Sequence, residues 1–381
     1  MNTSTAYSAR LANKEATAPR SKLTIAVVAP SLDILGGQGV QAKSLMEALR
    51  IEGFNVEFIP INPRFPKWLQ WARKVPVLRT IINQLLYLPS LRRVRQAQLV
   101  HVFSASYWSF LIAPVPAILA ARLYKRPVLL NYHSGEAPDH LSKWGWRVHP
   151  WLNLVQDIVV PSEFLEKVFA HHGYNARVVR NMIDTSSFRY RERVPLRPRL
   201  LSARNLESHY RVDNTLKAFA LVQKEYPEAT LTIAGYGSQE AALKEQAKGM
   251  LGVKFVGRVE PKDMPALFEA ADIFVNSSVV DNQPVSILEA FSAGLAVIST
   301  PTGDIPAMLQ GGARGRLVPH DDPEAMATAI CETLEQQSGV TAMTRAARVE
   351  AERYSGPMVS REWAELYTAH ASSLPVLPER A

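Results

Sequence analysis

Short apolar runs, rich in β-branched residues, alternate along the chain with segments whose apolar positions follow a helical period. The runs cover residues 23–29, 54–60, 99–103, 127–133, 157–160 and 176–180 in the first half, and 200–203, 230–234, 253–256, 273–276, 296–300 and 315–318 in the second. Such alternation is typical of βαβ units, which build parallel sheets covered by helices. The pattern therefore predicts an α/β protein with two Rossmann-like, doubly wound domains.

The two halves are separated by a segment that is rich in arginine and proline but has little apolar periodicity. A length of 381 residues agrees with two domains. The expected parts are a disordered lead-in (1–21), an N-terminal Rossmann-like domain (22–185), a linker (186–198), a C-terminal Rossmann-like domain (199–354), and a helix packing across the domains with a tail (355–381). Because ligands of doubly wound sheets bind beyond the carboxyl ends of the strands, we expect a site in the cleft between the domains.

The longest apolar run, residues 107–123, is interrupted by Ser109, Pro114 and Pro116 and predicts a buried helix rather than a membrane span. The first 21 residues lack the continuous apolar core of a secretory signal. Cys331 is the only cysteine, which excludes an intrachain disulfide and agrees with a reducing compartment. We therefore expect a cytoplasmic protein.

Positive charge is concentrated in the first domain. The formal net charge is +8, and no acidic residue lies between Glu57 and Glu136, a stretch with eleven Lys and Arg residues. Segments 65–74, 86–95 and 143–151 mix these cations with tryptophan and aliphatic residues, as surface-lying membrane segments do. We expect this domain to contact an anionic inner membrane leaflet and a lipid or lipid-linked molecule; the alternative is a solvated basic face. No nucleic-acid module is recognisable, so nucleic acid is not an expected partner.

The strongest candidate site lies in residues 276–294, where a buried strand is followed by a polar loop and a helix. Pro284 suits the first helical turn, which leaves the N–H groups of Val285 and its successor without partners. A helix start of this kind binds anions such as phosphate. Glu289 lies further along the helix and Asp281 stands eight positions before it, so the two carboxylates can bracket one ligand.

This arrangement resembles the E-x7-E motif of GT-B glycosyltransferases, in particular the retaining enzymes of family 4, also called glycosyl transferases group 1, with Asp281 where the first Glu usually stands. Segments 178–188, 271–277 and 302–306 are similar to further motifs of that family. The resemblance covers nearly the whole chain and implies the GT-B architecture, with two domains facing a cleft. It also implies retaining transfer of a sugar from a nucleotide diphosphate-sugar to a hydroxyl of a lipid-linked glycan, polysaccharide or glycolipid precursor.

Arg204 closes the first strand of the second domain, from where a guanidinium can grip a diphosphate. Family members usually carry a Lys where this chain has Tyr210, so Arg211 is the expected substitute. The resemblance implies that Asp281 and the backbone of Asn282 and Gln283 face the donor sugar, and that Glu289 faces the ribose. The full set of expected donor-binding residues is Gly36, Gly37, Arg204, Arg211, Gly235, Arg258, Val259, Asp281, Asn282, Gln283, Pro284, Val285 and Glu289.

His133 ends a strand at the active edge of the first sheet and coincides with the family's acceptor-side histidine. We expect it to position or stabilise charge. His101, which also ends a strand, is interpreted as structural. The expected catalytic residues are His133, Arg204 and Asp281.

No D-x-D signature occurs in the chain, so neither a metal nor another cofactor is expected beside the nucleotide diphosphate-sugar. The departing phosphate itself could deprotonate the incoming hydroxyl. The sequence does not identify the nucleobase of the donor, the sugar or the acceptor. Two other interpretations stay open: a nucleotide-sugar epimerase of similar fold, and a non-catalytic nucleotide-sugar-binding protein, the latter because of Asp281 and Tyr210.

Overall fold

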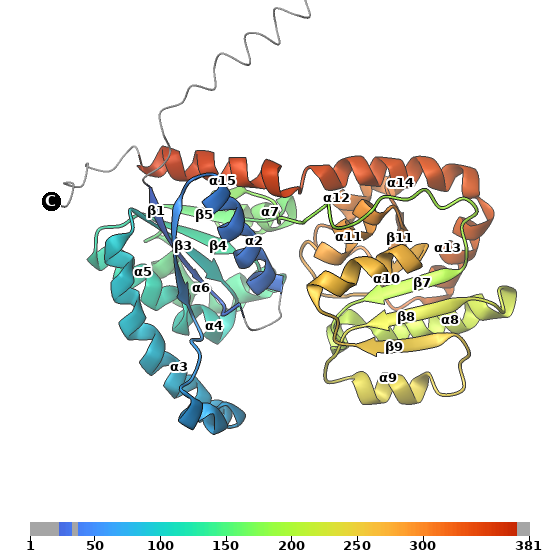
Figure 1. Cartoon of the computed structure of the whole chain (residues 1–381), viewed down its shortest axis with the longest axis horizontal. Coiled ribbons are helices and arrows are strands. Elements are labelled where there is room, and N and C mark those ends of the chain that lie inside the picture. Colours follow the sequence, from blue (N-terminus) through green and yellow to red (C-terminus); the bar gives the residue numbers. More distant parts are fainter. Residues whose placement is uncertain (1–22, 33–36, 372–381) are drawn as a thin grey trace, which may run out of the picture.

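The computed structural model describes residues 23–32 and 37–371. The expected lead-in, Gly36 and residues 372–381 of the expected tail lie outside the described residues. Two lobes lie side by side, each built on one sheet, and the last described helix, α15 (Gly356–Ala371), lies along the N-terminal lobe (Figure 1).

The sheet of the N-terminal lobe is wholly parallel and has the order β2-β1-β3-β4-β5-β6. The two central strands β3 and β4 are buried along their whole length, because elements pack on both faces of the sheet. The strands are β1 (Thr24–Ala29), β2 (Asn55–Pro60), β3 (Leu99–Ser104), β4 (Val128–Tyr132), β5 (Asp157–Val160) and β6 (Ala176–Val178).

The sheet of the C-terminal lobe is also parallel and has the order β12-β11-β10-β7-β8-β9. Its strands are β7 (Arg199–Ala203), β8 (Thr230–Ala234), β9 (Val253–Gly257), β10 (Ile273–Asn276), β11 (Ala296–Ser299) and β12 (Arg316–Leu317). All twelve expected strands are present, with ends within two residues of the expected ones. The expected α/β class with two doubly wound domains is confirmed.

Helices connect successive strands in both lobes. Those of the N-terminal lobe are α2 (Gly37–Ile51), α3 (Pro76–Ser90), α4 (Tyr107–Ile112), α5 (Pro114–Leu123), α6 (Ala137–Leu152) and α7 (Glu163–His171), with the 3-10 segments η1 (Lys67–Lys74) and η2 (Leu91–Gln96). Those of the C-terminal lobe are α8 (Val212–Glu225), α9 (Glu240–Gln246), α10 (Met264–Ala270), α11 (Val285–Ala293), α12 (Ile305–Leu309), α13 (Pro323–Glu335) and α14 (Gln337–Glu352).

The expectation of one buried helix over residues 107–123 is wrong. The run forms two short helices, α4 and α5, which meet at Ala113 because Pro114 cannot continue the first helix and instead starts the second. Part of the run is also exposed rather than buried: Trp108 keeps 64% and Leu123 75% of its surface accessible. Apolar composition alone therefore overstates the burial of this layer.

The chain passes between the lobes twice, and the two crossings lie side by side. The N–H of Ile183 on the first crossing donates to the carbonyl of Tyr354 on the second at 2.9 Å. Beyond the second crossing, α15 packs on α2 and β3 of the N-terminal lobe and buries Trp363 and Tyr367 there. The expected domain boundaries stay a prediction.

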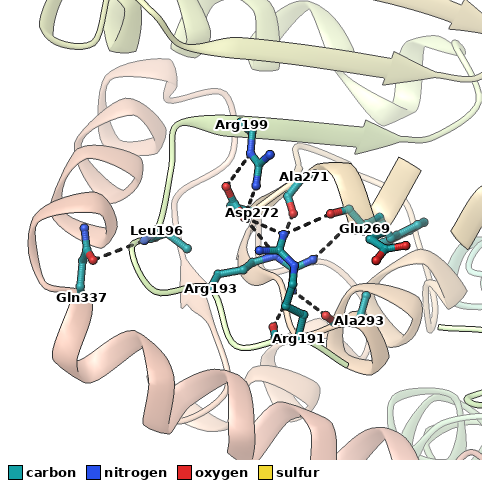
Figure 2. A network of polar contacts seen from close by, with 10 residues as sticks. Arg191, Arg193, Leu196, Arg199, Glu269, Ala271, Asp272, Ala293 and Gln337 are labelled. Atoms are coloured by element: carbon teal, nitrogen blue, oxygen red, sulfur yellow. Dashed lines mark hydrogen bonds and ion pairs between the residues drawn. The ribbon is translucent and has the colours of Figure 1, made fainter. Parts of the chain in front are cut away.

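The arginine-rich connection is fastened to the C-terminal lobe by one buried carboxylate (Figure 2). Asp272, just before β10, is fully buried and pairs with Arg191 (3.3 Å), Arg193 (3.3 Å) and Arg199 (2.8 Å). The buried guanidinium of Arg193 also donates to the carbonyls of residues 191, 268, 271 and 293. Because one carboxylate bridges three guanidinium groups and Arg193 also bonds four carbonyls, this stretch holds one fixed course along the lobe.

Removing that carboxylate should destabilise the fold. Asp272→Asn leaves the buried Arg193 without its counter-charge, so we expect the free energy of unfolding in urea to fall by about 3 kcal/mol. The control is Asp263→Asn, which changes an exposed aspartate without an ion pair to any described residue and should leave stability nearly unchanged. Equal effects of the two substitutions would contradict the role given to Asp272.

Candidate functional site

The candidate site lies where the strand order of the C-terminal sheet reverses, between β7 and β10. In doubly wound sheets this reversal opens a crevice at the carboxyl ends of the strands. Arg204 follows β7, and the loop that begins after Asn276 leads from β10 to α11. The sheet topology therefore brings together residues about eighty positions apart in the sequence, as the separation of 82 between Arg204 and Ser286 illustrates.

Two adjoining cavities lie between the lobes and share the walls formed by Gly37, Gln41, Arg204 and Val285. The larger, about 630 Å³, is bounded by the loop after β4 on one side and the loop before α11 on the other. The smaller, about 250 Å³, extends into the C-terminal lobe toward the loops after β8 and β9. The expected cleft is thus present, and both lobes line it.

Arg204 stands between the two cavities and is held from three sides. Its guanidinium is paired with Asp281, donates to the Ser286 hydroxyl at 3.2 Å, and lies 4.2 Å from the ring centroid of Tyr210. Its side chain is 10% exposed, and its buried Nε has no partner among the described residues. The group is therefore oriented in advance, with one donor left over for a ligand.

Gly235 is necessary for this position of Arg204. A Cβ on Gly235, whose φ is +152°, would come within 1.9 Å of the Arg204 carbonyl oxygen. The absence of a side chain lets the loop after β8 lie directly against the loop after β7. Gly235, expected among the donor-binding residues, thus supports the site by packing.

Glu289 lies one turn along α11 and lines the smaller cavity, where it is partly buried. Its carboxyl forms no hydrogen bond or ion pair with the described residues. Desolvation raises the pKa of Glu289 to about 8, against an opposing effect of the nearby Arg204 charge. An unpartnered carboxyl at this depth is available to a hydroxyl-bearing ligand.

The loop before α11 is also the main contact between the lobes. A Cβ on Gly135 would lie 2.7 Å from the Asp281 carbonyl, so the two backbones touch directly. The Ser162 hydroxyl donates to the Asn282 side chain at 2.5 Å, and Asn181 bonds Gln283 twice at 3.3 Å. The side chains of Asn282 and Gln283 therefore join the lobes, and the Asn282 N–H is already bonded to the Asp281 carboxylate at 3.0 Å.

His133 reaches the larger cavity from the N-terminal lobe and stacks on Phe103 with ring centroids 5.2 Å apart. Its Nε2 is buried without a partner among the described residues. Burial lowers the pKa of His133 to about 4, so the ring is neutral at neutral pH. His101 behind it is fully buried and is bonded through both ring nitrogens, to Tyr367 at 2.6 Å and Asn131 at 3.1 Å.

The remaining expected residues divide into two groups. Gly37, Gly235, Arg258, Val259, Val285 and Glu289 line the smaller cavity, and Gly37, Asp281, Asn282, Gln283, Pro284 and Val285 line the larger one. Pro284 was expected in the first turn of the helix. It instead directly precedes α11, which begins at Val285. Gly36 lies outside the described residues.

Arg211 is not brought to this group. It lines neither cavity and is paired with Asp321 at 2.8 Å and Asp213 at 3.3 Å. Its φ of +48° just before α8 turns the chain away from the cleft. Tyr210, the residue that replaces the expected Lys, lies in the site instead, with its ring under Arg204.

Sequence analysis assigned no role to the side chains of Gln41, Asn181 and Ser286. Gln41 ties α2 to the first crossing through two bonds to the Met182 backbone, at 2.7 and 2.8 Å. Their partners lie more than eighty residues away in the sequence, so only the tertiary fold reveals them. Among the described residues no group of three or more His, Cys, Asp and Glu side chains is placed to hold a metal ion.

The raised pKa of Glu289 predicts a pH-dependent stability. The Glu289 carboxyl binds its proton more tightly in the folded chain than in the unfolded chain, where its pKa is 4.5. The free energy of unfolding therefore falls as the pH rises from about 4.5 to about 8. Glu289→Gln lacks this loss, and its stability relative to wild type should grow by about 4 kcal/mol between about pH 5 and about pH 8.5 in urea unfolding. The exposed Glu228→Gln serves as control, and a pH-independent difference for Glu289→Gln would contradict the buried-carboxyl account.

Solved structures share this architecture. HepE from Anabaena, in complex with UDP-glucose, has a TM-score of 0.70 at 17% identity and covers 91% of this chain and 100% of its own. Sucrose-phosphate synthase from Thermosynechococcus elongatus has a TM-score of 0.71 at 16% identity and covers 92% of this chain and 100% of its own. At such identities the likeness establishes the fold.

Relatives in sequence carry transferase names. Glycogen synthase of Mycobacterium tuberculosis is 27% identical over 253 residues, which is 61% of this chain and 60% of that protein, less than two thirds of its length. The phosphatidyl-myo-inositol mannosyltransferase of Mycolicibacterium smegmatis is 24% identical over 361 residues, which is 91% of this chain and 93% of that protein.

Two family descriptions match the chain on either side of the linker. Glycosyltransferase Family 4 matches residues 35–187 and Glycosyl transferases group 1 matches residues 197–336. The first match lies in the N-terminal lobe and the second in the C-terminal lobe. With this match and the two facing parallel sheets, the chain belongs to the GT-B glycosyltransferases of the group 1, family 4 type.

Proposed function

We propose that the protein transfers a sugar from a nucleotide diphosphate-sugar to a hydroxyl acceptor with retention at the anomeric carbon. The observation that carries this proposal is the position of Arg204, a pre-oriented guanidinium at the junction of two cavities. The start of α11 lies on the same wall and adds the positive end of a helix dipole. A diphosphate at this junction would meet both groups at once.

The two cavities suit the two ends of such a donor. The nucleoside would occupy the smaller one, with the base near Arg258 and Val259 and the ribose hydroxyls on the Glu289 carboxyl. The sugar would extend into the larger one, between His133 and the loop from Asp281 to Gln283. HepE of similar fold has been solved with UDP-glucose, which supports a UDP-sugar as the first donor to test.

In the proposed reaction the bond from the anomeric carbon to the diphosphate oxygen breaks, and the acceptor oxygen bonds to the same face of that carbon. Arg204 and the α11 start stabilise the negative charge that develops on the leaving diphosphate. The acceptor hydroxyl gives its proton to that phosphate, so the chain needs no separate base. His133 is neutral and positions the sugar, and Asp281 holds Arg204 in place.

Because Arg204 and the α11 start stabilise the leaving diphosphate in this proposal, transfer should persist in the presence of a metal chelator.

An epimerase and a non-catalytic binding protein would use the same donor cavities. An epimerase would change the donor sugar without any acceptor, and a binding protein would bind the donor without turnover. Product analysis after incubation with a nucleotide sugar separates the three, because only a transferase releases the nucleoside diphosphate in step with glycosylation of the acceptor.

The N-terminal lobe, which would bind the acceptor, carries a surface suited to a membrane. One face of α3 packs on η1 through Leu78, Ile82 and Leu86. The other face exposes apolar side chains in a helical stripe, and η1 adds two exposed tryptophans. The exposed residues of this surface are Trp68 (75%), Trp71 (61%), Val77 (71%), Ile81 (51%), Leu85 (67%) and Leu88 (48%). Helix α3 projects from the N-terminal lobe on the side away from α15 (Figure 1).

Exposed cations surround this apolar face, including Lys67, Arg73, Lys74 and Arg79, and no acidic residue interrupts them in the sequence. An apolar face with a basic rim binds anionic bilayer surfaces. No helix within the described ranges is long and apolar enough to span a bilayer. We therefore propose peripheral attachment at the cytoplasmic membrane face and a lipid-linked acceptor, as the name of the related phosphatidyl-myo-inositol mannosyltransferase also suggests.

Loss of Arg204 should abolish transfer. Arg204→Gln removes the main stabilising charge on the leaving diphosphate, so we expect the rate of nucleoside diphosphate release to fall about 100-fold or more. Arg345→Gln, a control on the exposed surface of α14, should act like wild type. A thermal-shift screen of UDP-, GDP- and ADP-sugars identifies the donor first, because a ligand that binds only the folded state raises its stability. Full activity of Arg204→Gln would refute the proposed site.

Membrane attachment should depend on the basic rim. Arg73→Gln with Lys74→Gln removes two cations and should weaken sedimentation with anionic liposomes at low salt by about 1 kcal/mol for each charge, or about fivefold each. Lys244→Gln with Lys248→Gln removes two exposed cations from the C-terminal lobe and should have little effect. If wild-type protein stayed in the supernatant, peripheral attachment would be abandoned.

A further inference from the structure

A cluster of aromatic side chains lies on α4 and α6, outside the cavities described above. Three tryptophans from these two helices surround one guanidinium. The Arg147 guanidinium carbon lies 4.7 Å from the Trp144 ring centroid, 4.7 Å from that of Trp146 and 5.9 Å from that of Trp108. We call the four residues Trp108, Trp144, Trp146 and Arg147 the aromatic platform.

The platform is preassembled yet open to solvent. Trp108 is 64% and Trp146 is 74% exposed, while Trp144 and Trp108 meet edge to face with centroids 5.2 Å apart. Exposed indoles of this size leave a large apolar area in water, which a folded protein rarely keeps without a ligand or partner. The indole faces are therefore available for stacking.

Arg147 supplies a charge without a counter-charge. It forms no ion pair or hydrogen bond with the described residues, whereas neighbouring Lys143 is paired with Asp139 at 2.7 Å. The guanidinium carbon lies against the Trp144 and Trp146 rings, and guanidinium N–H groups bind phosphate well. An anion beside the stacked rings would complete this site.

Helix α6 leads from the cleft to the platform. Glu136 lines the larger cavity and directly precedes α6, so at a rise of 1.5 Å per residue Trp144 lies about 12 Å further along the helix. On α4 the platform is anchored by Tyr107, which has a φ of +56° and whose hydroxyl bonds to Asp139. Such backbone strain in an aromatic residue is concentrated at functional sites.

We propose that the aromatic platform binds the phosphorylated sugar head of a lipid-linked acceptor, with a sugar ring stacked on Trp108 or Trp146 and a phosphate on Arg147. Ile112, four positions after Trp108 on α4 and 37% exposed, continues the platform with apolar surface for the lipid. This proposal rests on the proposed transferase function and names the acceptor class of that same site.

Ligand-observed NMR with full-length protein tests the platform directly. The probes are glucose 1-phosphate, glucose, inorganic phosphate and the decyl phosphodiester of glucose, and an Arg204→Ala background removes binding at the donor site. We expect glucose 1-phosphate to bind more tightly than glucose or phosphate alone, and the decyl probe to bind most tightly. Trp146→Ala should weaken glucose 1-phosphate about fivefold and Trp146→Phe less, because phenylalanine keeps part of the stacking.

Arg147→Gln should weaken glucose 1-phosphate about tenfold and leave the weak binding of glucose unchanged, because only the phosphate contact is lost. The proposal is overturned if all probes bind alike, if these substitutions have no effect, or if Arg204→Ala alone abolishes probe binding. It is also overturned if Trp146→Ala lowers liposome binding as much as Trp71→Ala does while probe binding is unchanged, which would make the platform part of the membrane surface.

A separate measurement, of UDP binding, detects a failure of the donor-site proposal. In chains with Arg204 intact, UDP binding measured by thermal shift should be the same for wild type, Trp146→Ala and Arg147→Gln. Loss of UDP binding with intact probe binding would overturn the donor site and leave the platform standing.

Discussion

The ion pair between Arg204 and Asp281 is the interaction on which the site depends. It joins the end of β7 to the loop before α11, the two elements that flank the reversal of strand order. Asp281 balances the guanidinium while the Tyr210 ring and Ser286 fix its plane. Because Asp281 holds the Arg204 side chain in this orientation before a ligand binds, ligand binding needs little reorganisation of the site.

The same loop couples the two lobes to each other. Gly135 lies against the Asp281 backbone, and Asn282 and Gln283 are bonded to Ser162 and Asn181 of the other lobe and the first crossing. The geometry of the donor site therefore depends on the contact between lobes. A second set of charges around Asp272 holds the connecting segment, whereas Arg204 Nε has no partner among the described residues.

Much of the fold could be predicted because its central strands are buried on both faces and are therefore mostly apolar, as in β3 and β10. The same criterion failed for residues 107–123, where the exposed Trp108 and Leu123 are as apolar as buried residues. The motif from Asp281 to Glu289 was informative because loop and helix are contiguous in sequence. Arg211 was expected in the cleft as the substitute for the family's Lys at the Tyr210 position, but it is paired with Asp213 and Asp321 and lines neither cavity.

The central claim is that Arg204 and the start of α11 receive the diphosphate of a nucleotide sugar. A crystal structure of the protein with bound UDP tests it most directly. The claim predicts phosphate oxygens within hydrogen-bonding distance of the Arg204 guanidinium and the first N–H groups of α11, with ribose hydroxyls on Glu289. Phosphates bound away from Arg204, for example beside Arg211, would contradict it.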